Sequence, residues 1–216
     1  KSLRYLRSAF NWAITEKYLI ENPCKDIKPI KIPEKQPLFF SETDFQILIK
    51  SIDGKDIRDI VIFAVNTGLR LRELTTLHWN QINLKDKYLI LDNMNHTTKS
   101  KKIRTLALNN KALQILNERE FQNDKNVFTI NNLRFNADLL SKKFKRYVIS
   151  SGLNPKLKFH SLRHTFASWL VQRGVSIYEV SKLLGHSDIK TTEIYSHLRA
   201  EEVEGHSLRL ICTYFY

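Results

Sequence analysis

The stretch that decides the fold covers residues 159 to 170 and reads Phe-His-Ser-Leu-Arg-His-Thr-Phe-Ala-Ser-Trp-Leu. Apolar residues recur in it at helical spacing, so it predicts a helix with one face toward a core. That face comprises Leu162, Phe166, Trp169 and Leu170. We expect His160 and His164 one turn apart on the other side, with Arg163 near the edge of the apolar stripe.

Three polar side chains on one non-core face need an explanation. A single histidine there is most simply a hydrogen-bonded structural residue, but two histidines and an arginine together favour a functional site. A metal site from His160 and His164 lacks the glutamate of the His-Glu-x-x-His pattern and a third ligand. We therefore expect no metal and no other cofactor.

On the C-terminal side, Ser176 and Glu179 form a capping-box pattern that predicts a helix through residue 184. Gly185 ends that helix, and His186 follows on the turn, where a side chain can point into a cleft. Tyr195 comes nine residues later, inside an expected helix over 188–198.

On the N-terminal side, residues 67–74 read Thr-Gly-Leu-Arg-Leu-Arg-Glu-Leu and place Arg70 at the start of an expected helix over 70–77. Free backbone N–H groups at a helix start favour an anion, and a guanidinium binds two phosphate oxygens at once. Residues 98–104 read Thr-Lys-Ser-Lys-Lys-Ile-Arg and predict a basic β-turn that reaches along a DNA backbone.

The remaining pattern predicts a mainly α domain with a small antiparallel β-sheet within 82–108. Further helices are expected over 2–20, 41–52, 56–66, 110–119, 133–150, 160–173 and 176–184. Between the first helix and the rest, prolines and lysines predict an extended basic linker with a domain boundary near residue 37.

The charge balance favours a polyanionic partner. The 216 residues carry a formal net charge of +13, and 42% of them are hydrophobic, which is enough for a packed core. Cys24 and Cys212 show neither zinc-site nor disulfide-framework spacing. No apolar run is long enough to span a bilayer, so we expect a cytoplasmic protein. The chain begins with Lys1, and its only methionine is Met94, so we also expect a segment upstream of it.

Five motifs in this order resemble the phage-integrase family of tyrosine recombinases, over roughly residues 38–200. They are Thr-Gly-Leu-Arg-x-x-Glu-Leu at 67–74, Thr-Lys-x-x-Lys-x-Arg at 98–104, His-x-Leu-Arg-His-Thr-Phe-Ala at 160–167, Leu-Leu-Gly-His-Ser at 183–187, and Tyr195. The resemblance implies a tyrosine-recombinase catalytic fold over 38–200. It also implies that residues 1–37 hold the last helix of a DNA-clamping, core-binding domain and a linker.

The resemblance also implies a role for each matching residue. Tyr195 would be the nucleophile that forms a transient 3′-phosphotyrosine, while Arg70 and Arg163 would clamp the scissile phosphate. Lys99 would protonate the departing 5′ oxygen. The remaining roles fall to His160, which would assist proton transfer with the tyrosine, to His186, which would hydrogen-bond the phosphate, and to Glu73, which would orient the cluster.

The implied activity is site-specific DNA recombination without metal or ATP. Two alternatives stay open: a type IB topoisomerase-like relaxation of DNA, and a catalytically silent DNA-binding regulator. The partners would be double-stranded DNA and further copies of the chain in a homotetrameric synapse. Predicted DNA contacts are Arg72, Lys101, Lys102, Arg104, Lys142, Lys143, Lys145 and Arg146. The apolar tail 201–216 would dock on its own domain or on a neighbouring subunit, or it is an altered end left by a truncated or shifted reading frame.

Overall fold

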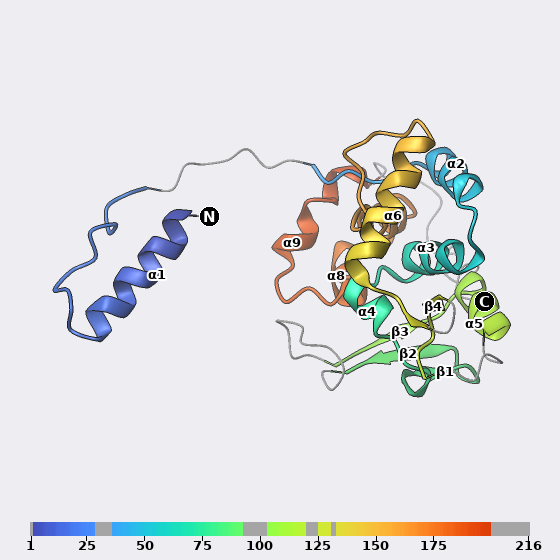
Figure 1. Cartoon of the computed structure of the whole chain (residues 1–216), viewed down its shortest axis with the longest axis horizontal. Helices are drawn as coiled ribbons and strands as arrows, with labels where there is room; N and C mark the ends of the chain where they lie inside the picture. The colour runs from blue at the N-terminus through green and yellow to red at the C-terminus, as the bar shows by residue number, and fades with distance from the viewer. Residues whose placement is uncertain (1, 29–35, 93–102, 120–124, 131–132, 200–216) are drawn as a thin grey trace. The chain divides into compact units, whose positions relative to one another are not determined.

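The computed structural model describes residues 2–28, 36–92, 103–119, 125–130 and 133–199. The chain divides into two compact units, Lys1–Lys35 and Gln36–Tyr216 (Figure 1). Lys99, Lys101, Lys102, part of the expected linker and the tail 201–216 lie outside the described residues. Within the described residues, no helix is long and apolar enough to cross a membrane.

The first unit is built on the helix α1, Ser2–Thr15, which is shorter than the helix expected over 2–20. It ends early because Lys17 adopts a left-handed φ of 61° and the amide of Tyr18 bonds back to the carbonyl of Ala13 at 2.8 Å. The turn that follows is tied back to the helix, since Arg7 Nε donates to the carbonyl of Cys24 at 3.0 Å.

The second unit is mainly helical, as expected, with small antiparallel sheets. Its first half contains α2 (Glu42–Ser51), α3 (Lys55–Thr67), α4 (Leu71–Thr75), the 3₁₀ helix η1 (Trp79–Gln81), β1 (Ile82–Asn83), β2 (Tyr88–Leu91), β3 (Arg104–Ala107) and α5 (Asn110–Arg119). Its second half contains β4 (Thr129–Ile130), β5 (Leu133–Arg134), α6 (Ala137–Ser150), α7 (Ser161–Gln172), α8 (Ile177–Leu184), α9 (Lys190–Glu193) and the 3₁₀ helix η3 (Ser196–Leu198).

Strand β2 lies between β1 and β3 in an antiparallel sheet along one edge of the unit (Figure 1). Its register pairs Leu89 with Leu106, both buried, and Leu91 with Arg104. Arg104 therefore opens β3 at the end of the ladder, opposite the last residue of β2.

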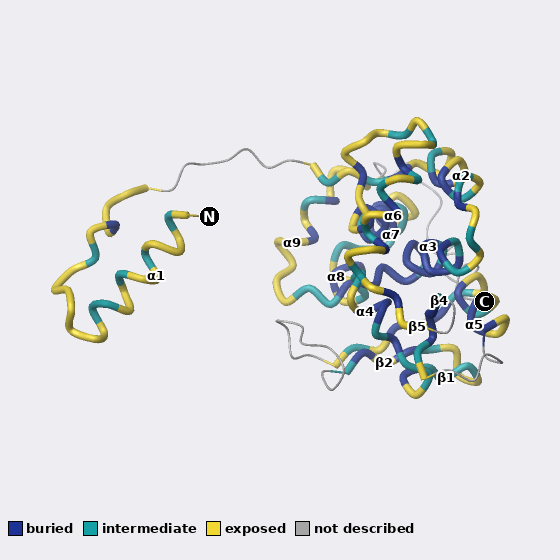
Figure 2. The backbone as a smooth tube through the Cα atoms, viewed as in Figure 1, coloured by how far each residue is buried: buried dark blue, intermediate teal, exposed yellow. Residues whose placement is uncertain are grey.

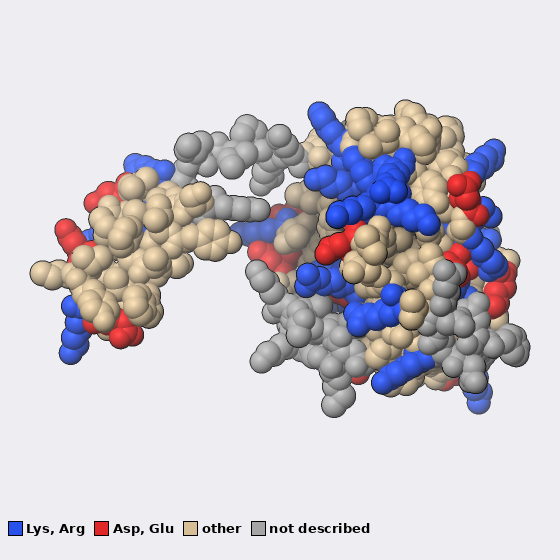
Figure 3. All heavy atoms as spheres, viewed as in Figure 1, with Lys and Arg blue, Asp and Glu red and all other residues tan. Residues whose placement is uncertain are grey.

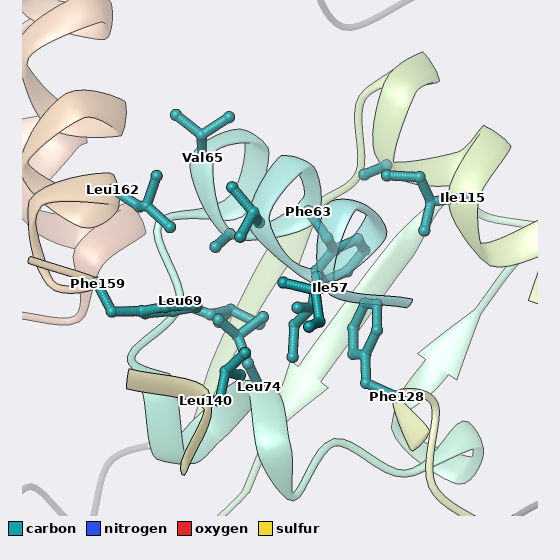
Figure 4. Packing of buried hydrophobic residues seen from close by; sticks show 14 of the residues in the cluster. Ile57, Phe63, Val65, Leu69, Leu74, Ile115, Phe128, Leu140, Phe159 and Leu162 are labelled. Carbon is teal, nitrogen blue, oxygen red and sulfur yellow. The ribbon is translucent and has the colours of Figure 1, made fainter. Parts of the chain in front are cut away.

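The core lies around α3 and α7, which pack against each other in the middle of the unit (Figure 2). Apolar side chains from helices, strands and loops meet there, among them Ile57, Phe63, Leu74, Phe128 and Leu162 (Figure 4). A second apolar cluster joins α7 to α8 and to the chain around Tyr195. Because the two clusters pack against α7 from two sides, several of its polar residues are buried as well.

The expected helix boundaries are confirmed where a side chain caps the helix. Ser41 Oγ accepts the amide of Asp44 at 3.0 Å at the start of α2. Ser176 and Glu179 form a reciprocal capping box at the start of α8, and Gly185 ends that helix with a φ of 66°.

Three expected helices of the second unit differ from the structure. The helix expected over 133–150 begins only at Ala137, because Leu133–Arg134 pairs with β4 and Asn136 then caps the helix. The helix expected over 70–77 stops at Thr75, because the chain turns to bond Val127 N to Leu77 O at 2.9 Å. The helix expected over 188–198 is divided into α9 and η3, with Tyr195 between them.

Candidate active site

Arg163 lies at the centre of a cluster of charged and aromatic side chains. It is only 3% exposed, and its guanidinium donates to the carbonyls of Gly68 at 2.7 Å and Leu184 at 2.6 Å. We expected it near the edge of the apolar stripe of α7, and it is buried there because α7 is covered by α3 on one side and α8 on another. The two carbonyls accept the hydrogen bonds that a buried guanidinium can no longer donate to water.

Burial and like charge both act on Arg163. Burial above all, and then the positive charges of Arg70 and Arg104, lower the pKa of its guanidinium to about 9, while Glu73 opposes them. Three arginines therefore lie within electrostatic reach of one another. The cluster is a region of concentrated positive charge that an anion would relieve.

Glu73 is the carboxylate that holds two of these arginines. It is buried, and its oxygens accept from Arg70 Nη1 at 2.9 Å, from the Arg70 amide at 2.8 Å and from Arg104 Nη2 at 2.7 Å. Burial acts to raise the pKa of Glu73, but Arg104 and Arg70 together bring it below its ordinary value. The Arg70 side chain remains 37% exposed, so its guanidinium faces both Glu73 and solvent.

Arg104 differs from its expected role as a surface DNA contact. Its side chain is only 11% exposed, and it points inward to Glu73 and to the carbonyl of Leu184, to which Nη1 also donates. The pattern of the sequence could not show this, because Arg104 follows a run of lysines that reads as one basic turn. Its burial results from the pairing of β3 beside α4 and α8.

His186 follows Gly185 on the turn after α8, as expected. Its Nδ1 lies 2.8 Å from the hydroxyl of Thr192, a buried residue of α9. Burial, together with the neighbouring charges of Arg163, Arg70, Arg104 and His160, lowers the pKa of His186 to about 4. The imidazole is therefore neutral at pH 7. It lies within electrostatic reach of the three arginines.

Tyr195 is 2% exposed and its hydroxyl lies 2.5 Å from Nδ1 of His164. Burial raises the pKa of Tyr195 to about 12, opposed by Arg163, and burial lowers the pKa of His164 to about 4. The phenol is therefore protonated at pH 7 and shares a hydrogen bond with a neutral imidazole. Sequence reasoning placed His164 beside His160 but gave it no role, because only the fold brings Tyr195 to it.

His160 precedes α7 and packs its ring edge-on against that of His164, with 4.8 Å between ring centroids. Desolvation lowers its pKa, and Arg163 and Arg70 lower it further. Within the described residues, the Tyr195 hydroxyl bonds to His164, and His160 makes no hydrogen bond to it. Within that part of the chain, no three His, Cys, Asp or Glu side chains gather closely enough to hold a metal.

The other predicted DNA contacts lie on the surface. Arg72 is exposed on α4, and Lys142, Lys143 and Arg146 are exposed on α6. Figure 3 shows Lys and Arg side chains gathered over α6. A hollow of about 470 Å³ there is lined by Ser141, Lys142, Lys145, Arg146 and Lys158.

The geometry brings separate segments together to offer two kinds of chemistry in one place. Arginines from α4, β3 and α7 supply positive charge, and the phenol of Tyr195 supplies a hydroxyl that can act as a nucleophile once its proton is removed. This combination is suited to reaction at the phosphorus of a phosphate ester.

Comparison with known proteins agrees with this class of site. The model of the phage integrase family matches residues 39–202. The chain is 32% identical to the tyrosine recombinase XerC-like protein of Caldanaerobacter subterraneus, an alignment that covers 90% of this chain and 60% of that protein. It is 31% identical to tyrosine recombinase XerC of Proteus mirabilis over 89% of this chain and 65% of that protein. The chain thus spans less than two thirds of the length of these relatives, and it belongs to the phage integrase family.

Solved structures share the fold at lower identity. The integrase of the Tn1549 transposon, in complex with a circular intermediate DNA, superposes with a TM-score of 0.74 at 20% identity, covering 92% of this chain and 73% of that one. A lambda integrase tetramer bound to a Holliday junction superposes with a TM-score of 0.70 at 20% identity, covering 86% of this chain and 57% of that one.

Proposed function

We propose that this chain carries the catalytic centre of a site-specific DNA recombinase that cleaves and rejoins strands through a tyrosine. The observation that supports this best is the gathering of Arg70, Arg163, His186 and Tyr195 from four separate segments around one cluster of positive charge. Family membership and relatives named as recombinases favour this reading over a topoisomerase or a silent regulator.

In the proposed reaction, the oxygen of Tyr195 attacks a backbone phosphorus of DNA. The new bond is Tyr195 Oη–P, and the bond that breaks joins phosphorus to the 5′ oxygen of the next nucleotide. The phenol loses its proton and the departing oxygen gains one, so charge and atoms balance without a metal or ATP. Attack by the free 5′ hydroxyl of a partner strand reverses the step and rejoins DNA.

The residues divide this work between them. Arg70 and Arg163 neutralise the charge that accumulates on the non-bridging oxygens, and His186 donates a hydrogen bond to one of them. His160 assists removal of the phenol proton, and Lys99 protonates the departing oxygen. Glu73 orients the arginines. Since Tyr195 is buried against His164, it leaves this hydrogen bond before it attacks.

We further propose that double-stranded DNA crosses the basic surface over α6, and that four copies of the full protein assemble on two DNA duplexes. The exposed cations of α6 and Arg72 support the first statement, because backbone phosphates attract clustered Lys and Arg. The DNA-bound tetramer of the structurally similar lambda integrase supports the second. The compartment that fits this partner is the cytoplasm.

Covalent trapping tests the reaction. The chain and a Tyr195→Phe variant are incubated with nicked suicide duplexes drawn from DNA that flanks the gene, since a nick lets the cleaved fragment diffuse away and traps the intermediate. We expect a protein–DNA band that resists SDS for the unmodified chain and no band for Tyr195→Phe. Its position along the flanking DNA would locate the cleavage site.

Other outcomes contradict the proposal in different ways. A band that persists in Tyr195→Phe would assign the nucleophile to another residue. No band, repeated with the full-length protein, would favour a DNA-binding regulator. Relaxation of supercoiled plasmid without joined recombinant strands would favour a topoisomerase.

A further inference from the structure

We propose that Arg104 is a positioning residue of this site and not a contact to DNA. The inference rests on the proposed function, because positioning has meaning only for a catalytic centre. It goes beyond the reaction itself and concerns the residue that keeps the separate parts of that centre in their relative positions.

The guanidinium of Arg104 connects three segments that are distant in the sequence. From β3, its Nη2 donates to Glu73 at 2.7 Å, and its Nη1 donates to the carbonyl of Leu184 at the end of α8. The same carbonyl accepts from Arg163 at 2.6 Å, and the same carboxylate accepts from Arg70 at 2.9 Å. Arg104 thus shares one acceptor with each of the two arginines proposed to bind the phosphate.

Arg104 also lies against the turn that carries His186. A Cβ atom added at Gly185 would stand 2.4 Å from Nη1 and 2.8 Å from Cδ of Arg104. Gly185 already needs its φ of 66°, which other residues adopt at a cost. The turn therefore fits closely over the guanidinium, and movement of Arg104 would move His186.

The burial of Arg104 argues against a role on the DNA surface. Its side chain is 11% exposed, whereas Arg72, Lys142 and Arg146 are exposed. Its two terminal nitrogens are occupied by a carboxylate and a carbonyl. A lysine could not replace this arrangement, because its single ammonium lacks the planar pair of donors that reaches both acceptors.

The test compares Arg104→Met and Arg104→Lys with Arg58→Met. Arg58 is a matched control, because it donates to the carbonyl of Ile52 at the end of α2, at the opposite end of α3 from Gly68. At saturating nicked duplex from the gene's flanking DNA, we expect both Arg104 variants to form the covalent complex at least about 100-fold more slowly. Arg58→Met should remain within about threefold of the unmodified chain.

Binding to a non-specific 30-base-pair duplex separates positioning from DNA contact. Removing one phosphate contact lowers the slope of log affinity against log salt by about one. We expect an unchanged slope for Arg104→Met. A slope lowered by about one together with unimpaired cleavage would overturn the proposal, as would full cleavage by Arg104→Lys.

A measurement without DNA keeps the inference testable if the unmodified chain forms no covalent complex, which would count against the proposed function alone. The pKa of His186 is followed by nuclear magnetic resonance of its imidazole. Because Arg104 contributes to the lowered pKa of His186 and supports its turn, we expect Arg104→Met to raise this pKa by about one unit or more. Arg58→Met should leave it unchanged, and so should a folded Arg104→Met if the inference is wrong.

Discussion

Gly68 shows how far a single residue can determine the site. It ends α3 with a left-handed φ of 63°, and its carbonyl accepts a hydrogen bond from Arg163 at 2.7 Å. A Cβ atom at this position would lie 2.4 Å from Cδ1 of Phe166, a buried residue of α7. One glycine thus allows the chain to turn, lets α7 approach, and orients the central arginine.

We expect Gly68→Ala to lower the free energy of unfolding by about 3 kcal/mol, since left-handed strain costs about 1–2 kcal/mol and overpacking adds about 1–3 kcal/mol. Gly152→Ala is the control, because Gly152 has a similar φ of 69° but nothing within 4 Å of the added Cβ. Chemical denaturation should show that Gly152→Ala lowers the free energy of unfolding by only about 1 kcal/mol. Equal losses for the two variants would show that packing against Phe166 contributes nothing.

The segment that carries Tyr195 is built from two short elements. It consists of the four-residue helix α9 and the three-residue helix η3, with Tyr195 at the junction. Its inward side-chain hydrogen bonds join Thr192 to His186 at 2.8 Å and Tyr195 to His164 at 2.5 Å, beside the apolar packing of Tyr195 on α7 and α8. A short element can open locally without unfolding the domain.

We expect His164→Ala to increase the hydrogen-exchange rate of residues 190–198 about fivefold, because a net hydrogen bond is worth about 1 kcal/mol. His160→Ala is the control, since its ring packs on His164 but does not contact Tyr195. Mass spectrometry of peptides from this segment gives the rates. Unchanged exchange in His164→Ala would mean that apolar packing alone retains Tyr195.

How far the elements could be predicted depends on how local their causes are. Capped helices such as α2 and α8 were predictable, since the residues that begin and end them are adjacent in sequence. Strand β5 and the break between α9 and η3 were not, because partners elsewhere in the fold impose them. The same holds for the site. Its motifs identified Arg70, Arg163, His186 and Tyr195 as candidates, but the burial of Arg104 and the pairing of His164 with Tyr195 are tertiary.

For the whole molecule, the half-buried histidines His164 and His186 link stability to pH. The pKa values of His164 and His186 are about 4, below the ordinary value of 6.5, so the folded chain binds fewer protons than the unfolded chain between these values. The free energy of unfolding therefore rises with pH across this window, and stability is lost as the pH falls from about 6.5 to 4.

We expect this acid loss to be about 2 kcal/mol for the two residues together, discounted for their partial exposure from about 1.4 kcal/mol per pKa unit. Urea unfolding at pH 6.5 and at pH 4.5 measures it. His186→Asn should flatten the dependence, whereas His197→Gln should not, because His197 is exposed on η3. If the free energy of unfolding of His186→Asn fell with pH as steeply as that of the unmodified chain, the acid loss would belong to other groups.

The cluster of Arg70, Arg104 and Arg163 around one carboxylate has a practical consequence for anyone who handles this protein. Three cations with a single anion among them form a region that attracts multiply charged counterions, so sulfate and phosphate should raise the melting temperature more than chloride at equal ionic strength. A phosphate buffer would then be a competitor and not a neutral medium. The rate of the proposed cleavage, measured in this buffer, would be underestimated, and a thermal-shift screen of small dianions would identify ligands of this cluster.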